Sequence, residues 1–447
     1  MWPPSRSTRL SCALLALLMP GAASAAHLDY DIGIGIEHDD NINLSEHDPI
    51  SEDILIPSFG FSVNELGSTI QAYADGVVEY RNYLGGTYSD EFRGDIAGRL
   101  NWSVAPDRLD FTVQDRLALE PINTLVPNTP NNLQQTNVFA LGPIFNFRFA
   151  PTVRGQAEAF FIDSYADETE EFNSQRLDAA FRVIKDLDPS SSISANIADE
   201  RATFDNSSIS PDYNHYGVFG RYKRTWAKVD LTTDLGYSWL NYSGSPSDLD
   251  RDSPLFRTDL AWRFAPHDTL LLDLGYEFSD AATGLLDGIA EPTAAGENGI
   301  RIPPDVAIGG AAISSAAYLS TIAVLTYRYS AERFEFSIAP YYHKYDYGAV
   351  TLPEVGAIDE TGRGGSISAS WVLRPLLTFG VTATFDNLSY DTISRSDHNR
   401  YYTAFLHQQW ARHWSWRAEL TRNERHSSED GLSSDENIAF VGITYTR

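Results

Sequence analysis

Acidic and amide side chains crowd one short stretch near the start of the chain. Glu37, Asp39 and Asp40 are followed closely by Asn41 and Asn43, and calcium and magnesium prefer oxygen ligands of this kind. An EF-hand loop also needs a glycine at its sixth position and a glutamate at its twelfth, and this stretch has neither. Small and apolar residues alternate just before it. We therefore interpret the acidic stretch as the place where a β-strand passes from an apolar to an aqueous environment.

Four histidines are candidates for the general base of a hydrolase: His343, His398, His407 and His413. Such a site would also need a nucleophile and a group that orients the base. No G-x-S-x-G or H-E-x-x-H motif accompanies these histidines, and the chain has no glycine-rich loop of the Walker type for a nucleotide. We therefore expect no enzymatic activity, no catalytic residue, no cofactor and no metal site.

A second acidic cluster comprises Asp163, Asp167, Glu168, Glu170 and Glu171. Its carboxylates are suited to divalent cations, which could link the chain to the phosphates of lipopolysaccharide. A solvated surface loop explains the same composition without any ligand, and we favour that interpretation. The stretch 245–252 is interpreted in the same way.

Residues 1–25 have the composition of a secretory signal peptide. Arg6 and Arg9 precede a short apolar core and an A-x-A cleavage signal, and the apolar core is too short to span a membrane. We therefore expect cleavage and a mature chain of residues 26–447. Cys12, the only cysteine, lies in the leader, so the mature chain is expected to have no disulfide and no thiolate metal site.

The composition excludes several classes of partner. The formal net charge of −28 argues against nucleic acid and against a basic patch that binds anionic lipid. Disordered acidic chains are poor in aromatic residues, whereas aromatic residues make up 12% of this chain. An exported, acidic and aromatic-rich chain is typical of an outer-membrane protein.

Apolar and polar residues alternate strictly over long segments. Clear examples are residues 92–102, 229–239, 270–278 and 377–385. A period of two places one set of side chains on each face of a sheet. Strands of soluble proteins usually have about 5 to 6 residues, whereas membrane strands need about 9 to 11. The length of these segments favours membrane strands.

The connections between these segments alternate between short and long. Short ones occur at 105–107, 188–190 and 265–267, and alternating turn and loop lengths are typical of outer-membrane barrels. The long polar ones fall at roughly 119–136, 164–174, 204–213, 241–253, 280–317, 345–363, 387–399 and 425–436. The 280–317 connection is rich in Gly, Ala and Pro, and we expect it to fold into the barrel and narrow its interior.

The sequence thus predicts an all-β fold that consists of one domain, residues 26–447. We expect a single transmembrane antiparallel up-and-down β-barrel of about 18–20 strands, with short periplasmic turns and long extracellular loops. An even strand number places both termini on the periplasmic side. The predicted location is the bacterial outer membrane, where lipid, lipopolysaccharide and the barrel-assembly machinery would be partners.

Charged residues of both signs occupy the polar faces of the predicted strands. In a barrel these faces line a wet interior, whose charges act on any passing solute. Arginine forks could hold acidic groups of a polymer, but we favour a wall of mixed pairs formed across strands. The predicted pore-lining residues are Arg93, Asp95, Arg99, Asp110, Arg116, Arg154, Glu158, Arg257, Asp259 and Arg263.

Several segments carry a resemblance to a known family. A strand within 30–45 runs into Asp-Asp-Asn-Ile-Asn-Leu-Ser, and a Leu-Ile-Pro-Ser-Phe strand follows at 55–59. Tyr-Arg-Asn-Tyr occupies 80–83, and Gln-Thr-Asn-Val-Phe occupies 135–139. In these features the mature chain resembles the outer-membrane β-barrel porins of exopolysaccharide operons, the beta-barrel porin 2-like family. Many barrels end on an aromatic residue, whereas this chain ends on Arg447.

The resemblance implies passage or export of a polysaccharide, in the first place an exopolysaccharide, together with periplasmic polysaccharide-export proteins. Two alternatives remain open from the residues themselves. One is a general diffusion porin for small polar solutes, which needs no partner. The other is a non-conducting structural or adhesin barrel, whose interior is filled by its own side chains and loops.

Overall fold

The computed structural model describes residues 27–206, 211–243, 249–289 and 311–447. Its first ten strands are β1 (His27–Asp39), β2 (Glu52–Leu66), β3 (Ile70–Tyr83), β4 (Glu91–Ala105), β5 (Leu109–Pro121), β6 (Leu133–Ala150), β7 (Val153–Ala166), β8 (Ser174–Asp188), β9 (Ser191–Phe204) and β10 (Tyr213–Thr225). The others are β11 (Val229–Tyr242), β12 (Arg251–Ala265), β13 (Asp268–Ser279), β14 (Tyr318–Ala331), β15 (Phe334–Asp346), β16 (Glu360–Arg374), β17 (Leu377–Tyr390), β18 (Arg395–Ala411), β19 (Trp414–Ser427) and β20 (Ser434–Thr446).

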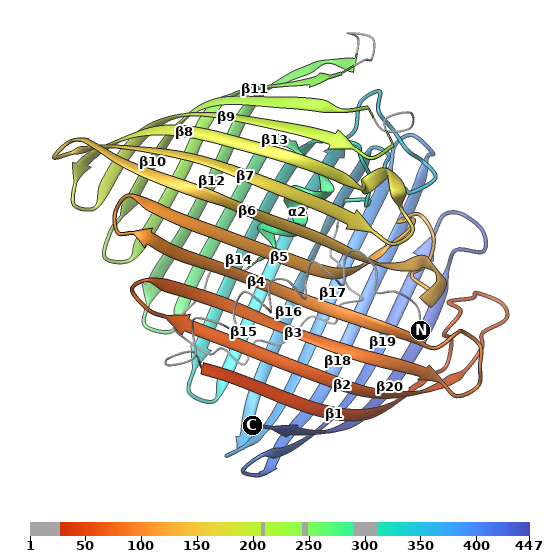
Figure 1. The fold of residues 1–447 in the computed structure, drawn as a ribbon. Helices are drawn as coiled ribbons and strands as arrows, with labels where there is room; N and C mark the ends of the chain where they lie inside the picture. The colour runs from red at the N-terminus through yellow and green to blue at the C-terminus, as the bar shows by residue number, and fades with distance from the viewer. Residues whose placement is uncertain (1–26, 207–210, 244–248, 290–310) are drawn as a thin grey trace.

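All twenty strands belong to one sheet that closes on itself. Each strand pairs antiparallel with its neighbours in sequence, and β1 pairs antiparallel with β20. That last pairing runs from Asp31 opposite Thr446 to Asp39 opposite Ile438, and Figure 1 shows the two strands side by side. Closure leaves no unpaired sheet edge. The predicted all-β antiparallel barrel is confirmed, with twenty strands.

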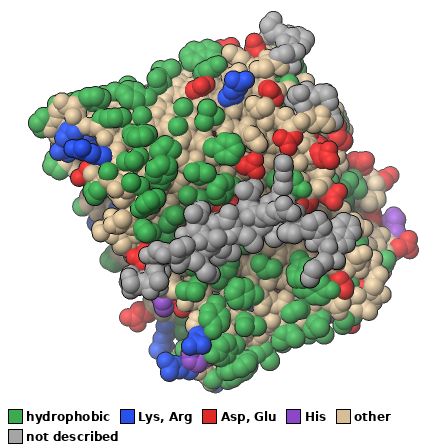
Figure 2. Space-filling model, viewed as in Figure 1, with side chains coloured by type: hydrophobic (Ala, Val, Ile, Leu, Met, Phe, Trp, Pro, Cys, Tyr) green, Lys and Arg blue, Asp and Glu red, His purple; other side chains and the backbone are tan. Residues whose placement is uncertain are grey.

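The alternation of the sequence sorts side chains between the two faces of the barrel. On β1, Ile32, Ile34 and Ile36 project outward and are 56%, 54% and 50% exposed, whereas Gly33 and Gly35 between them face inward and are buried. Hydrophobic side chains gather over the outer surface in Figure 2. This outer face is the one that suits lipid, because the charged residues of the strands turn mainly inward.

The two ends of the barrel differ, as the sequence predicted. At the turn end, hairpins are tight, and Asp107 and Leu376 adopt positive φ values of 60° and 69° within them. At the loop end, longer connections such as 122–132 and 347–359 join the strands. The 164–174 connection is shorter than predicted, because β7 continues to Ala166. Asp163 therefore lies in a strand and not in an acidic loop. The predicted long connection at 387–399 is only 391–394, because β17 continues to Tyr390 and β18 begins at Arg395.

Exposed aromatic residues mark both ends of the outer face. Trp102, Trp262, Trp410 and Trp414 lie near the turn end of their strands, whereas Trp239 lies near the loop end of β11. The rings of Trp410 and Trp414 stack at 6.4 Å between centroids. Indole rings favour the boundary between lipid and water, so these positions suit the two edges of a membrane.

Helical segments are few in the part of the chain that the structure describes. Short 3₁₀ helices η1 (Pro130–Asn132) and η2 (Glu170–Phe172) lie in loops, and helix α2 (Ala281–Asp287) follows β13 and enters the barrel (Figure 1). Within the described residues, no helix is long and apolar enough to cross a membrane.

Helix α2 packs against the inner wall of the barrel. Ala281 and Ala282 join a buried cluster with residues of β6 and β7, including Val138 and Ile162. The side chain of Asp280 caps the helix by accepting a hydrogen bond from the Thr283 amide at 3.0 Å. The described start of the 280–317 connection thus folds inward as predicted, while residues 290–310 lie outside the described residues.

Candidate functional site

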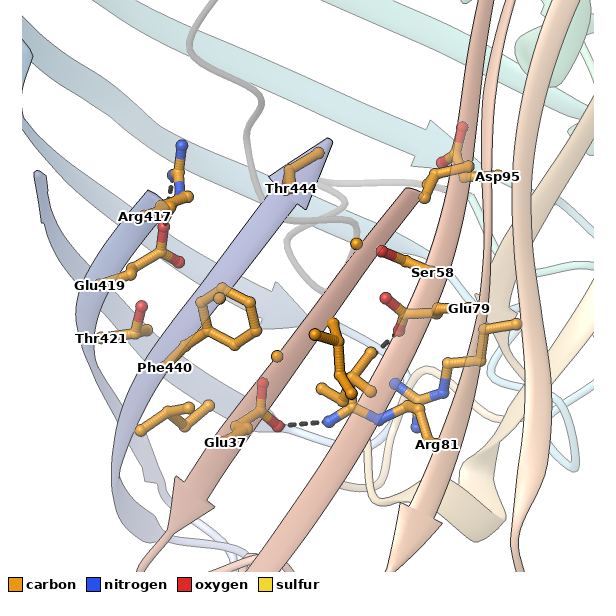
Figure 3. Close-up of a pocket in the computed structure, with 18 of the residues that line it drawn as sticks. Glu37, Ser58, Glu79, Arg81, Asp95, Arg417, Glu419, Thr421, Phe440 and Thr444 are labelled. Atoms are coloured by element: carbon orange, nitrogen blue, oxygen red, sulfur yellow. Dashed lines mark hydrogen bonds and ion pairs between the residues drawn. The ribbon is translucent and has the colours of Figure 1, made fainter. Parts of the chain in front are cut away.

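A cavity of about 520 Å³ opens in the lumen beside the seam where β1 meets β20. Strands β1 to β5 form one side of it, and β18, β19 and β20 form the other. Figure 3 shows charged side chains of both groups of strands projecting into the same space. The cavity therefore exists only because the first and last strands of the chain pair.

Glycines let an aromatic ring pack against the wall of this cavity. A Cβ added at Gly35 would lie 2.3 Å from the Phe440 ring, and one at Gly442 would lie 2.7 Å from it. Both distances are too short for any real side chain. Phe440 thus depends on bare backbone at two positions, and it adds an apolar ring to a wall of charges (Figure 3).

Ion pairs within single strands follow from the period of two. Residues two apart share a face of a strand, so Arg93 reaches Glu91 at 2.8 Å on β4. On β19, Arg417 pairs with Glu419, its Nε donating at 2.9 Å. The arginine donors are in this way turned towards carboxylates of the same strand.

Other ion pairs link different strands. Arg81 on β3 pairs with Glu37 on β1 and, at 3.2 Å, with Glu79 on its own strand. Arg116 on β5 donates twice to the Asp95 carboxylate, at 2.7 and 3.2 Å. Each arginine that lines this cavity therefore has a carboxylate partner, and binding an anion would require one of these pairs to open.

The predicted pore-lining residues do not form one cluster. Arg93 and Asp95 line the cavity at the seam, and Arg116 contacts Asp95. Glu158 and Arg257 instead line a second cavity of about 260 Å³ between β7 and β13. These five residues thus divide between two separate parts of the lumen.

The other five predicted residues line neither cavity. Arg154 and Arg263 pair near the turn end with Asp186 at 2.9 Å and Asp230 at 2.6 Å. Asp110 accepts a hydrogen bond from Asn146 at 3.0 Å. Arg99 and Asp259 lie on β4 and β12, opposite Gln114 and Asp273. Contact of the predicted set with a passing solute stays a prediction.

Sequence reasoning selected Arg93 and Asp95 but missed the other charged and aromatic residues that build the seam cavity. From the sequence, Glu37 is expected only to mark a strand exit, and the predicted pore-lining set contains none of Arg81, Glu419 and Phe440. The Arg417–Glu419 spacing was a usable signal, because i and i+2 share a strand face. No local signal could connect β1 with β20, which are about 400 residues apart in the chain.

A buried ion-pair network fastens α2 to the barrel wall. The Arg176 side chain on β8 is 1% exposed; it pairs with Asp280 and, at 3.0 Å, with Glu200. Tyr213 donates to Asp280 at 2.5 Å. Burial alone would raise the pKa of Asp280, but the charge of Arg176 and the hydrogen bonds from Tyr213 and the Thr283 amide outweigh it and hold this pKa below its ordinary value.

The four candidate histidines are dispersed over the barrel. His343 lies 2.9 Å from Glu360, His398 contacts Asn387, and His413 contacts the Thr446 carbonyl at 2.8 Å. His407 lies on β18. Among the residues that the structure describes, no three His, Cys, Asp or Glu side chains are grouped so that they could hold a metal ion.

Comparisons with known proteins add only distant similarities. No family model matches the chain, and no curated protein matches it. Among solved structures it is similar to the ferric enterobactin receptor of Pseudomonas aeruginosa, at a TM-score of 0.47 and 11% identity over 95% of this chain and 82% of that one. The FrpB iron transporter of Neisseria meningitidis gives 0.47 and 10%, over 93% and 81%. OpdK of Pseudomonas aeruginosa gives 0.38 and 10%, over 94% and 98%. We base no functional argument on similarities of this size.

Proposed function

We propose that this barrel is a channel of the bacterial outer membrane and that its cargo is a polysaccharide, in the first place an exopolysaccharide. The observation that carries the proposal is the division of the wall. Twenty long strands turn an apolar face outward and a charged, hydrogen-bonding face inward. A barrel of this strand number has an interior wider than wall side chains can fill, and a polar interior suits a polar cargo. Membership of the exopolysaccharide-operon porins is part of the same proposal.

The paired charges suit a chain of sugars that moves without being held. A carboxylate in an ion pair keeps further acceptor sites, and an arginine has five donors. Sugar hydroxyls can exchange water for these groups along the lumen wall, and the Phe440 ring offers an apolar contact within it. Transport would be passive, with periplasmic export proteins delivering the polymer.

A diffusion channel for small solutes is the second candidate. It is favoured by α2, which occupies part of the lumen and reduces the space for a polymer. The two candidates differ in the size of solute that enters while α2 is docked.

Single-channel recording of the purified protein in planar lipid bilayers tests the proposal. We expect an ohmic conductance, and transient interruptions of it when neutral dextran oligosaccharides are added to one side. A matched lipid bilayer without protein is the control. Absence of conductance would refute the channel, whereas conductance that dextran never interrupts would favour small solutes. Normal exopolysaccharide secretion by a deletion strain would refute the export role.

A further inference from the structure

Two loops from opposite walls of the barrel meet across its loop end. The 122–132 loop joins β5 to β6, and the 347–359 loop joins β15 to β16. Strand β15 is the tenth after β5 in a closed sheet of twenty, so the two loops start half a circumference apart. The Thr124 amide donates to the Val355 carbonyl at 3.4 Å, and the Thr124 hydroxyl donates to the Gly356 carbonyl at 3.4 Å. The contact between these loops therefore crosses the mouth of the barrel.

A glycine makes this close contact possible. Gly356 adopts a φ of 84°, which favours glycine. A Cβ added there would lie 2.1 Å from the Thr124 hydroxyl oxygen, so any side chain would push Thr124 away. Beside it, the Asn123 side chain donates to the Glu354 carbonyl at 2.9 Å. Asn123 and Thr124 together form a latch on residues 354–356.

Each of the two loops is held in shape by contacts of its own. In the first loop, the Asn132 side chain donates to the Asn123 carbonyl at 2.9 Å and accepts from the Asn123 amide at 3.0 Å. In the second loop, Leu352 and Ala357 form an antiparallel bridge, and Ala357 packs in a buried cluster with Tyr345 of β15. The latch therefore joins two structured parts, which can separate without losing their own folds.

The 122–132 loop covers the loop end of the seam cavity. Its residues Pro127 and Pro130 line a small cavity of about 100 Å³, and Arg425 on β19 donates to the Leu125 carbonyl at 3.2 Å. This small cavity adjoins the seam cavity of about 520 Å³, because both are lined by Glu37, Arg81 and Arg93. The space along the seam thus narrows towards the loop end, and the 122–132 loop forms its roof.

We propose that the 122–132 loop is a lid over the outward exit of the seam cavity, closed by its latch on residues 354–356. Release of the latch opens the exit. The hydrogen bonds that hold the lid end on backbone carbonyls, and their net strength is small because water bonds a carbonyl nearly as well. Helix α2 occupies the lumen beside β6 and β7, so the lid covers the larger of the two spaces described above. The inference rests on the proposed channel.

A disulfide across the latch tests the lid by locking it shut. A Cβ at Gly356 would lie 3.2 Å from the Thr124 Cβ, close to the spacing of about 3.5–4.5 Å in disulfides. In the double variant Thr124→Cys with Gly356→Cys, we expect oxidation to form the disulfide, verified by mass spectrometry of peptides. Conductance in planar bilayers should then be lost, and a reductant should restore it. Thr124→Cys alone is the control, because the expected mature chain offers it no other cysteine.

A single methyl group tests the lid in the opposite direction. Gly356→Ala should displace Thr124 and raise the ratio of open to closed time in single-channel recordings by about tenfold, the effect of about one net hydrogen bond. Gly431→Ala is the matched control. Gly431 has a φ of 80°, close to the 84° of Gly356, but a Cβ added there meets nothing within 4 Å. The control therefore carries the same backbone strain without the displacement.

Three outcomes would overturn the lid. They are a disulfide that forms while conductance is unchanged, failure of the two cysteines to form a disulfide, and equal effects of Gly356→Ala and Gly431→Ala. Heat-modified migration on gels verifies that each variant is a folded barrel. Failure of the channel proposal would appear differently, as absence of conductance from the reduced double variant and from Gly356→Ala alike.

Discussion

Replacing Asp280 by asparagine should release α2 from the barrel wall while leaving the barrel folded. The substitution removes the charge that Arg176 faces but keeps a side-chain oxygen for the Thr283 amide, so the helix cap survives. Removing one partner of a buried ion pair destabilises by about 3–5 kcal/mol. Arg176 keeps Glu200 at 3.0 Å, so we expect the lower value of about 3 kcal/mol. That corresponds to roughly a hundredfold change in the docking equilibrium.

A cysteine introduced at Ala282 measures this equilibrium. Ala282 is 1% exposed in the docked helix, and the expected mature chain has no other cysteine. When opening is rapid, the rate of maleimide labelling follows the population of the open form. We expect Ala282→Cys to be labelled roughly a hundredfold faster when it is combined with Asp280→Asn.

A cysteine at the exposed Asp430 serves as the control, because its labelling should not respond to Asp280→Asn. Heat-modified migration on gels verifies that each variant is a folded barrel. Equal labelling of Ala282→Cys with and without the Asp280 carboxylate would refute the anchoring role. Faster labelling of both cysteines would instead indicate that the barrel as a whole is destabilised.

Three further predictions concern the wall and the anchor. Ile34→Arg, on the outer face, should destabilise the barrel by about 2–4 kcal/mol, measured by urea-driven unfolding from lipid vesicles. Ser58→Arg, on the lumen face, should not destabilise it. Equal effects of the two substitutions would contradict the assignment of faces. Gly35→Ala should lower the free energy of unfolding, measured by urea titration, by about 1–3 kcal/mol. Phe440→Leu in the Gly35→Ala background should recover part of this loss; no recovery would show that the Phe440 ring is not the obstacle. Because the pKa of Asp280 is lower when α2 is docked than when the helix is released, the contribution of this carboxylate to docking is complete above the ordinary pKa of an aspartate. The contribution is lost as the pH falls through the lowered pKa. Labelling of Ala282→Cys, corrected for thiol ionisation, should therefore stay constant from about pH 8 to about pH 5 and rise only below about pH 4, and a rise at neutral pH would contradict the assignment.

Much of the barrel was predictable from local patterns. Alternation along β1 predicted that Ile32, Ile34 and Ile36 would share one face, and they do. The period of two needs no knowledge of neighbouring strands, because successive side chains of any strand point to opposite sides. The boundary near Asp163 was misplaced, since polar residues can extend a strand beyond its apolar part.

The candidate site was less predictable, because it depends on contacts between distant strands. Arg93 and Asp95 were selected for their polar face, but nothing local indicated that Arg116 would be the partner of Asp95. Arg176 and Asp280 are about a hundred residues apart, and their contact requires α2 to enter the barrel. An ion pair needs both partners within a few ångströms, and chain position alone does not determine that distance.

The sequence by itself determined the class of fold, the two faces of each strand and the alternation of turns with loops, because these depend on residue spacing over one strand length. Only the tertiary structure decided which strands close the barrel, which carboxylate each arginine meets and where α2 lies. Pairing of β1 with β20 brings Gly35 against Phe440, and the acidic stretch at Glu37 and Asp39 thereby becomes part of a lumenal wall. Closure of the barrel pairs the first strand with the last. The sequence pattern does not specify that pairing, because the period of two that forms a strand is the same whichever strand lies beside it.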